Sequence, residues 1–336
     1  GYLSAFPETF FDRVESVRQV WAPYYTIHKI MAGLVDMYEN AGNAQALEIV
    51  EGMAPWVKSR TDKSDPFHME RVLNFTEQGG MNEVLSNLYS ITGKPEYLAT
   101  ARRFDERHYT EPLSRSEDKM KGEHVNSFIP NIIGSAREYE MTGDPALYGM
   151  ATFFWNEVTG ARTFATGGTS DNEAWETDPY QLYDELGSNS HESCCTYNML
   201  KLTRYLIRWT GDPKYADYYE RALWNGILPT QNPADGMMMY YVPMKPGMFK
   251  TFMKSFDSFW CCTGTGMENH AKYGDSIYFH DGDGLFVNLF IASELNWAEK
   301  GLKIRQETRF PEEARTTLVL SAAKPVELAL NIRIPV

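Results

Sequence analysis

The sequence predicts a mainly helical protein with a smaller β part, namely a toroid of helical hairpins followed by the start of a β-sandwich domain. A helix-ending motif recurs along the first two thirds of the chain, and strand-like segments follow after about residue 237. Of the 336 residues, 43% are apolar, which is ample for a large core. We therefore expect a helical domain over residues 1–280 and a partial β-sandwich domain over residues 281–336.

The recurring motif is Thr-Gly with a proline two residues after the glycine. It occurs as ITGKPEYL at 91–98, MTGDPALY at 141–148 and WTGDPKYA at 209–216, with an echo in ENAGNAQALEI at 39–49. The glycine suits the left-handed position that ends a helix. Asp144 and Asp212 can cap the next helix, whose first position takes the proline. Short turns of this kind predict antiparallel helix hairpins.

The hydrophobic periodicity then places the helices along the chain. We expect them at about 8–20, 24–41, 43–61, 78–91, 95–108, 124–141, 145–159, 192–209 and 213–228. The motifs are unevenly spaced, which indicates a toroid better than a regular solenoid.

The segment 161–191, ARTFATGGTSDNEAWETDPYQLYDELGSNSH, interrupts the helical pattern. It is rich in Gly, Ser, Asp and aromatic residues. A loop of this length in a compact domain is usually functional or disordered, and its Trp and Tyr content argues against disorder. We interpret it as a functional loop.

The strand-like segments form the last part of the chain. MMMYYVPM at 237–244 reads as a strand, and a short helix is expected after Cys261-Cys262. Further strands are expected in LFVNLFIASELNW at 285–297, LKIRQETRF at 302–310, TTLVLSAA at 316–323 and VELALNIRIPV at 326–336. The first residues carry no signal-type apolar core, and the final strand is barely finished. We therefore expect a chain trimmed at its N-terminus and cut at its C-terminus.

Composition excludes two classes of partner. The net charge is −13 with the acidic residues spread along the chain, whereas a nucleic-acid or anionic-membrane surface needs clustered Lys and Arg. No apolar run approaches the roughly 18 residues of a membrane span. Aromatic residues make up 14% of the chain, which suits a helical core or a cleft whose rings stack on sugar faces.

The four cysteines form two adjacent pairs, Cys194-Cys195 in HESCCTYN and Cys261-Cys262 in FWCCTG. The pattern leaves three interpretations open: a disulfide such as Cys194–Cys261, buried inert thiols, or a metal site. We favour the metal site, because Glu192 with Cys194, Cys261 and Cys262 supplies one carboxylate and three thiols, enough for a tetrahedral zinc. Thiolates select zinc over magnesium or calcium.

A metal-bound thiolate is also a nucleophile, so an acid nearby would be chemically important. The candidate is Glu173 in GGTSDNEAW, in the irregular loop just before the HESC segment. Glu176, Asp178 and Asp184 lie in the same loop and read better as surface charges.

These segments carry a family resemblance. TGGTSDNEAW, HESCCTYNMLKLTRYLIRWTGD and FWCCTGTGMENHAKYGDSIYF resemble glycoside hydrolase family 127, the β-L-arabinofuranosidases, and residues 1–38 are similar as well. The resemblance implies an (α/α)6 barrel followed by β-sandwich domains. It also implies a retaining exo-glycosidase that binds Zn2+ and releases terminal β-L-arabinofuranose from plant-type oligosaccharides or glycans.

The resemblance also assigns roles to individual residues. Cys261 matches the nucleophile, and Glu192, Cys194 and Cys262 match the other zinc ligands. Glu173 matches the general acid/base, with Asn172 where the family motif has glycine. Its pKa is expected to be raised by burial among Trp175 and other aromatic residues.

Three further residues match sugar contacts, namely His28 in YYTIHK, His124 in GEHVNSF and Tyr241 in MYYVPM. His270 could line the site or cap the short helix, and Cys195 has no role in the family pattern. The alternative to an enzyme is a carbohydrate-binding or scaffolding toroid with a structural zinc or a disulfide. The acidic, aromatic-rich character of a hydrolase of plant glycans suits the periplasm or the exterior, which we favour, whereas free thiolates suit a reducing cytoplasm.

Overall fold

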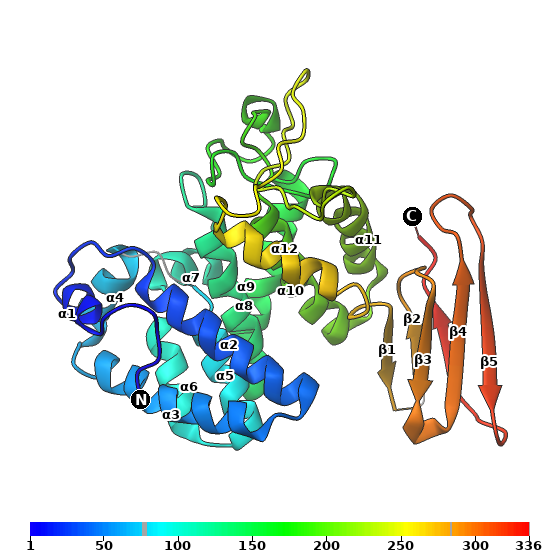
Figure 1. Ribbon diagram of the computed structural model, residues 1–336, viewed down its shortest axis with the longest axis horizontal. Coiled ribbons are helices and arrows are strands. Elements are labelled where there is room, and N and C mark those ends of the chain that lie inside the picture. Colours follow the sequence, from blue (N-terminus) through cyan, green and yellow to red (C-terminus); the bar gives the residue numbers. More distant parts are fainter. Residues whose placement is uncertain (76–78, 283, 336) are drawn as a thin grey trace.

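A computed structural model describes residues 1–75, 79–282 and 284–335, and it confirms the helical toroid followed by small sheets (Figure 1). The α-helices are α1 (Thr9–Glu15), α2 (Pro23–Ala41), α3 (Ala44–Thr61), α4 (Pro66–Phe75), α5 (Met81–Thr92), α6 (Pro95–Ala101), α7 (Arg107–Ser114), α8 (Val125–Thr142), α9 (Pro145–Ala161), α10 (Ser193–Thr210), α11 (Pro213–Ala222) and α12 (Cys261–Ala271). The strands are β1 (Tyr278–Asp281), β2 (Gly284–Val287), β3 (Ser293–Trp297), β4 (Leu302–Thr308), β5 (Thr316–Ala322) and β6 (Ala329–Ile332). No described helix has the length and apolar character needed to cross a membrane.

The long helices form two layers, because consecutive helices pack as antiparallel hairpins. The inner helices α2, α5, α8, α10 and α12 pack side by side in that order, and α3, α6, α9 and α11 each cover the inner helix that precedes them. Lys29 Nζ on α2 lies 3.5 Å from Glu268 Oε1 on α12, which links the first inner helix to the last. Together the inner helices line a cavity of about 470 Å3.

The helix ends follow the predicted motif. Gly93, Gly143 and Gly211 end α5, α8 and α10 with φ of 70°, 70° and 64°. The side chain of Asp144 accepts a hydrogen bond from the backbone of α9, and Asp212 does the same for α11. The hairpin prediction is therefore confirmed at each motif.

Several helix boundaries differ from the prediction. The helix expected at 8–20 ends at Glu15, because Val17 adopts a left-handed φ of 52°. The helix expected at 95–108 breaks at Asp105, which is extended, and α7 starts afresh at Arg107. The helix expected at 213–228 passes into a π-helical turn at Leu223. The helices α4 and α7 were not predicted. The helix expected at 78–91 begins in the prediction at residue 78, and this residue lies outside the described residues.

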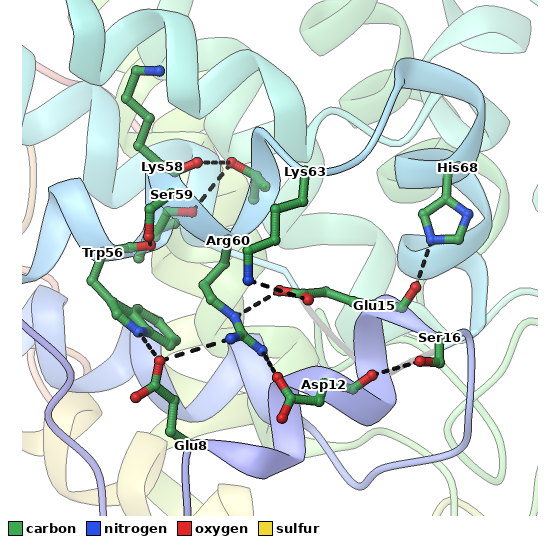
Figure 2. Close-up of polar contacts among 12 residues, drawn as sticks. Glu8, Asp12, Glu15, Ser16, Trp56, Lys58, Ser59, Arg60, Lys63 and His68 are labelled. Carbon is green, nitrogen blue, oxygen red and sulfur yellow. Dashed lines mark hydrogen bonds and ion pairs between the residues drawn. The ribbon is translucent and has the colours of Figure 1, made fainter.

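An ion cluster fastens α1 to α3 (Figure 2). Arg60, whose side chain is only 8% exposed, pairs with Asp12 Oδ1 at 2.8 Å and with Glu15 Oε1 at 2.6 Å. Trp56 Nε1 donates to Glu8 Oε1 at 2.8 Å in the same cluster. These contacts hold the short first helix against the outer layer.

Within the described residues the strands form two three-stranded sheets, in the orders β1-β2-β6 and β3-β4-β5. All neighbouring pairs are antiparallel except β2 and β6, which are parallel. The segment 285–297 supplies two strands in different sheets. β1 runs across the predicted domain division between residues 280 and 281. That division remains a prediction. The strand expected at 326–336 is limited to β6, and residues 283 and 336 lie outside the described residues.

The strand predicted at 237–244 is wrong. Its residues make only isolated bridges, between Gln231 and Met238 and between Glu192 and Tyr241. The segment pairs with the start of α10 instead of with a strand, and Pro243 has no N–H for a continuous ladder. This pairing brings the two tyrosines of the segment to the N-terminus of α10.

Candidate active site and metal centre

The two cysteine pairs meet at one point of the barrel. The ligand atoms of Glu192, Cys194, Cys261 and Cys262 all lie within 4.8 Å of one another. Cys194 Sγ is 2.9 Å from Cys262 Sγ, and Cys262 Sγ is 4.0 Å from Cys261 Sγ. Glu192 Oε1 lies 3.6 Å from Cys262 Sγ. One ion with zinc–sulfur bonds of about 2.3 Å can contact all four at such separations.

The chemistry of this donor set calls for a cation. Burial raises the pKa of Glu192 to about 8 and also raises the pKa of the Cys194 and Cys262 thiols. Hydrogen bonds from these two thiols lower the pKa of Cys261 to about 3. Gathering four potential anions in a buried place is unfavourable unless a positive charge offsets them. The quartet of Glu192, Cys194, Cys261 and Cys262 therefore fits a thiophilic divalent metal such as zinc.

Helix N-termini favour negative charge here as well. Glu192 is the N-cap of α10, and Cys194 lies in its first turn. Cys261 and Cys262 are the first two residues of α12. The partial positive charge at a helix N-terminus stabilises thiolates and carboxylates. Because outer helices return the chain between inner helices, these N-termini lie at the same end of the barrel.

The candidate acid lies beside the candidate nucleophile. The Tyr240 hydroxyl donates a short hydrogen bond to Glu173 Oε1 and lies 3.8 Å from Cys261 Sγ. A single hydroxyl thus contacts both groups. Glu173 and Cys261 are therefore neighbours across one hydroxyl, and a retaining glycosidase likewise needs its acid/base and its nucleophile close together.

The expected rise in the pKa of Glu173 is wrong. Hydrogen bonding from His124, followed by hydrogen bonds from Tyr240 and Tyr241, lowers this pKa despite partial burial. Trp175 does not shield the carboxylate, because its ring is fully buried against the helical core and donates to Thr169 Oγ1. Glu173 instead keeps 37% of its side chain exposed.

His124 is oriented by its position as the N-cap of α8. Its Nδ1 accepts a hydrogen bond from Ser127 N at 3.1 Å. This bond leaves the hydrogen of the neutral ring on Nε2, which lies 3.7 Å from Glu173 Oε2. A backbone bridge between His124 and Ala174 holds the two residues together. The ring therefore presents a donor to the carboxylate.

The loop that carries Glu173 has an unusual backbone. Ser170, Asn172, Glu173 and His191 are non-glycine residues with positive φ, of 86°, 45°, 72° and 52°. Such conformations are uncommon outside glycine and concentrate at functional sites. The backbone bridges of Asp171 with Ala174 and with Ser190 stabilise the loop. The sequence-based expectation of an ordered loop agrees with these contacts.

Of the remaining predicted residues, Tyr241 lies at this centre and His28 lines the barrel cavity. Tyr241 pairs through its backbone with Glu192 and hydrogen-bonds to Glu173. His28 is buried and lines the barrel cavity together with Thr265, whose Oγ1 is 2.9 Å from Cys194 Sγ.

His270 lies near the C-terminal end of α12, whereas the two cysteines of the quartet begin this helix. Its Nδ1 is 2.5 Å from the Tyr273 hydroxyl. The structure therefore places His270 with the end of the helix and not with the quartet.

Sequence reasoning missed Tyr240. The sequence points to Tyr241 in MYYVPM, whereas the hydroxyl of the preceding tyrosine is the one that contacts both Glu173 and Cys261. The only signal was the adjacency of the two rings. The disulfide alternative is not supported, because all four cysteines are free. Cys194 Sγ and Cys262 Sγ, at 2.9 Å, are also far beyond a bond of about 2.05 Å.

Comparisons with known proteins agree with this geometry. The family model of the β-L-arabinofuranosidase GH127 catalytic domain matches residues 1–275, and that of the GH127 middle domain matches residues 284–336. A comparison with curated proteins gives no match.

Three of the similar solved structures illustrate the shared fold. A GH127 β-arabinofuranosidase is 20% identical, with a TM-score of 0.72 over 93% of this chain and 50% of its own. A glycoside hydrolase is 18% identical, with a TM-score of 0.73 over 98% of this chain and 61% of its own. A GH127 β-L-arabinofuranosidase from Geobacillus stearothermophilus T6 is 17% identical, with a TM-score of 0.62 over 99% and 69%. The chain thus spans only part of the length of these relatives. Because the catalytic-domain model matches well over half of its residues, the chain belongs to glycoside hydrolase family 127.

Proposed function

We propose that this protein is a retaining exo-glycosidase that releases terminal β-L-arabinofuranose from oligosaccharides or glycans. The observation that carries the proposal is the Tyr240 hydroxyl, which contacts both Glu173 and Cys261 beside the quartet of one carboxylate and three thiols. Two of the similar structures are arabinofuranosidases by name. Pentofuranose is therefore the substrate class to test first.

Glu192, Cys194, Cys261 and Cys262 would hold the zinc ion. Zinc would supply the positive charge that keeps these sulfurs deprotonated. Cys261 has its sulfur next to Tyr240 and is a partly exposed residue, whereas Cys194 and Cys262 are fully buried. Cys261 is accordingly the nucleophile, and the other three residues orient it.

The reaction proceeds in two displacements. Cys261 Sγ attacks the anomeric carbon while the glycosidic C–O bond breaks, and Glu173 gives its proton to the departing oxygen. Glu173 then removes a proton from water, whose oxygen attacks the same carbon, and the C–S electron pair returns to Cys261. Two inversions retain the β configuration.

The lowered pKa of Glu173 suits its second role as a base. For its first role the carboxyl must be protonated, so substrate entry has to raise this pKa. A sugar that excludes water from the half-exposed carboxylate, or that takes the hydrogen bond from His124, has this effect. Catalytic hydrogen bonds commonly adjust in this way when substrate binds.

The test combines metal content, turnover and stereochemistry. We expect about one zinc per chain, hydrolysis of a synthetic β-L-arabinofuranoside, and a β product observed by NMR before mutarotation. Glu173→Gln should remove nearly all turnover and keep the zinc. Glu176→Gln removes an exposed carboxyl of the same loop and is the matched control. This variant should keep most of the turnover.

Three results would count against the proposal. An inverted product would reduce Cys261 to a ligand. A reversal of the two glutamine variants would move the acid to Glu176. A zinc-loaded protein that binds but does not cleave arabinofuranosides would favour the carbohydrate-binding toroid.

A further inference from the structure

The fourth cysteine, Cys195, has no role in the mechanism above, yet it lies against a metal ligand. Its Sγ is 3.2 Å from Glu192 Oε2. Both residues are completely buried, with exposed fractions of 0% and 1%. Glu192 and Cys195 are three residues apart at the start of α10, and side chains at this spacing are neighbours on a helix.

The two cysteines of the pair face different surroundings. Cys194 packs with Cys262, Met238 and Met253 at the quartet, whereas Cys195 packs in the large helical core. Cys195 therefore approaches Glu192 from the side away from the other sulfurs. The opposite oxygen, Glu192 Oε1, is the one that faces Cys262.

Ser170 completes a closed set of hydrogen bonds. Glu192 N donates to Ser170 Oγ at 3.2 Å, and the Ser170 hydroxyl hydrogen-bonds to the Cys195 sulfur. The Cys195 thiol in turn donates to Glu192 Oε2. Each polar atom in this buried group thus has a partner, and Ser170 is fixed by its left-handed backbone and by the bond from His191 N to its carbonyl. The carboxylate thus has one oxygen toward Cys195 and the other toward Cys262.

We propose that Cys195 is a positioning residue, whose thiol holds Glu192 Oε2 so that only Oε1 is presented to the metal. The inference rests on the proposed zinc site. Partners of this kind orient ligands and raise metal affinity. Without the thiol, Oε2 would be left buried with no hydrogen-bond donor. Rotation of the carboxylate away from this orientation would then be energetically favourable. The two adjacent cysteines then have different roles, because Cys194 is a metal ligand and Cys195 orients the ligand Glu192.

The experiment compares Cys195→Ala with Cys195→Ser. The two variants lose the same sulfur, but serine keeps a donor at this position. Zinc affinity is measured by competition with a chromophoric chelator, and thermal unfolding of the metal-free proteins reports any loss of core packing. We expect alanine to weaken zinc binding by about 10-fold to 100-fold, and serine to recover most of the affinity. Equal affinities for the two variants, or an alanine variant equal to the parent, would overturn the proposal.

Cobalt substitution gives a readout independent of turnover. Both variants should keep the intensity of the thiolate-to-cobalt charge-transfer band, because Cys195 is not a ligand. The ligand-field bands should change with alanine and not with serine, since only alanine frees the carboxylate. A loss of charge-transfer intensity in both variants would show that Cys195 binds the metal directly and would refute the positioning role. Failure of the parent protein to bind zinc would instead refute the proposed site itself.

Discussion

Removing the Tyr240 hydroxyl should raise the pKa of Glu173. The hydroxyl donates to Glu173 Oε1, and this hydrogen bond is one of the causes that lower the pKa of the carboxyl. A donor stabilises the charged carboxylate, so its loss favours the protonated form. Tyr240→Phe keeps the ring and its packing against Trp260 while deleting only the donor.

The size of the shift can be worked from the exposure of the carboxylate. A hydrogen bond to a charged group contributes roughly 1.5–3 kcal/mol where water is excluded. Glu173 keeps 37% of its side chain exposed, so water replaces part of the lost bond. We discount the contribution to about 1–1.5 kcal/mol, which at 1.36 kcal/mol per pKa unit corresponds to about one unit upward. Tyr241→Phe is the matched control, and its shift should be smaller because its bond to Glu173 contributes least.

The assay is the pH profile of kcat/KM, which reports ionisations of the free enzyme. The acid must be protonated in the first step, so the rate falls as pH rises through the pKa of Glu173. This limb should move to higher pH by about one unit in Tyr240→Phe. NMR titration of 13C-labelled glutamate carboxyls, assigned with Glu173→Gln, measures the same shift without turnover. A limb that stays in place or moves to lower pH would refute the assignment of Glu173 or its coupling to Tyr240.

Three further predictions concern stability and metal binding. Arg60→Met should destabilise the fold by about 2 kcal/mol in chemical denaturation, because Asp12 loses this buried partner and Glu15 keeps only Lys63. Lys58→Met, at an exposed pair, should change the stability little. Gly168→Ala should lower stability by about 1–3 kcal/mol and weaken zinc binding, since the new methyl would clash with the ring of His191, next to a ligand. Gly160→Ala, whose added methyl would have no atom within 4 Å, is the control and should be neutral or stabilising. Zinc removal by a chelator should lower the melting temperature reversibly, because the quartet then stays buried without a cation.

Local signals in the sequence predicted most of the long helices and the donor types of the candidate metal site. The glycines that end α5, α8 and α10 were readable because a helix terminus depends on a few neighbouring residues. The donor types of the quartet were readable for a similar reason, since metal preference follows from the ligand atoms themselves. The choice of Cys261 over Cys262 as nucleophile needed the family resemblance, because adjacent residues of the same type carry the same local signal.

Only the tertiary structure decided the features that depend on contacts between segments far apart in the sequence. The segment 237–244 is not a strand but is bridged to the start of α10. This pairing places the Tyr240 hydroxyl in contact with Glu173 and Cys261. The pKa of Glu173 went down and not up, because donors from His124 and the tyrosines outweigh partial burial. In both cases the outcome depends on which groups approach from elsewhere in the chain. Hydrogen bonds and electrostatic shifts act over a few ångströms in space, and sequence spacing does not encode those distances.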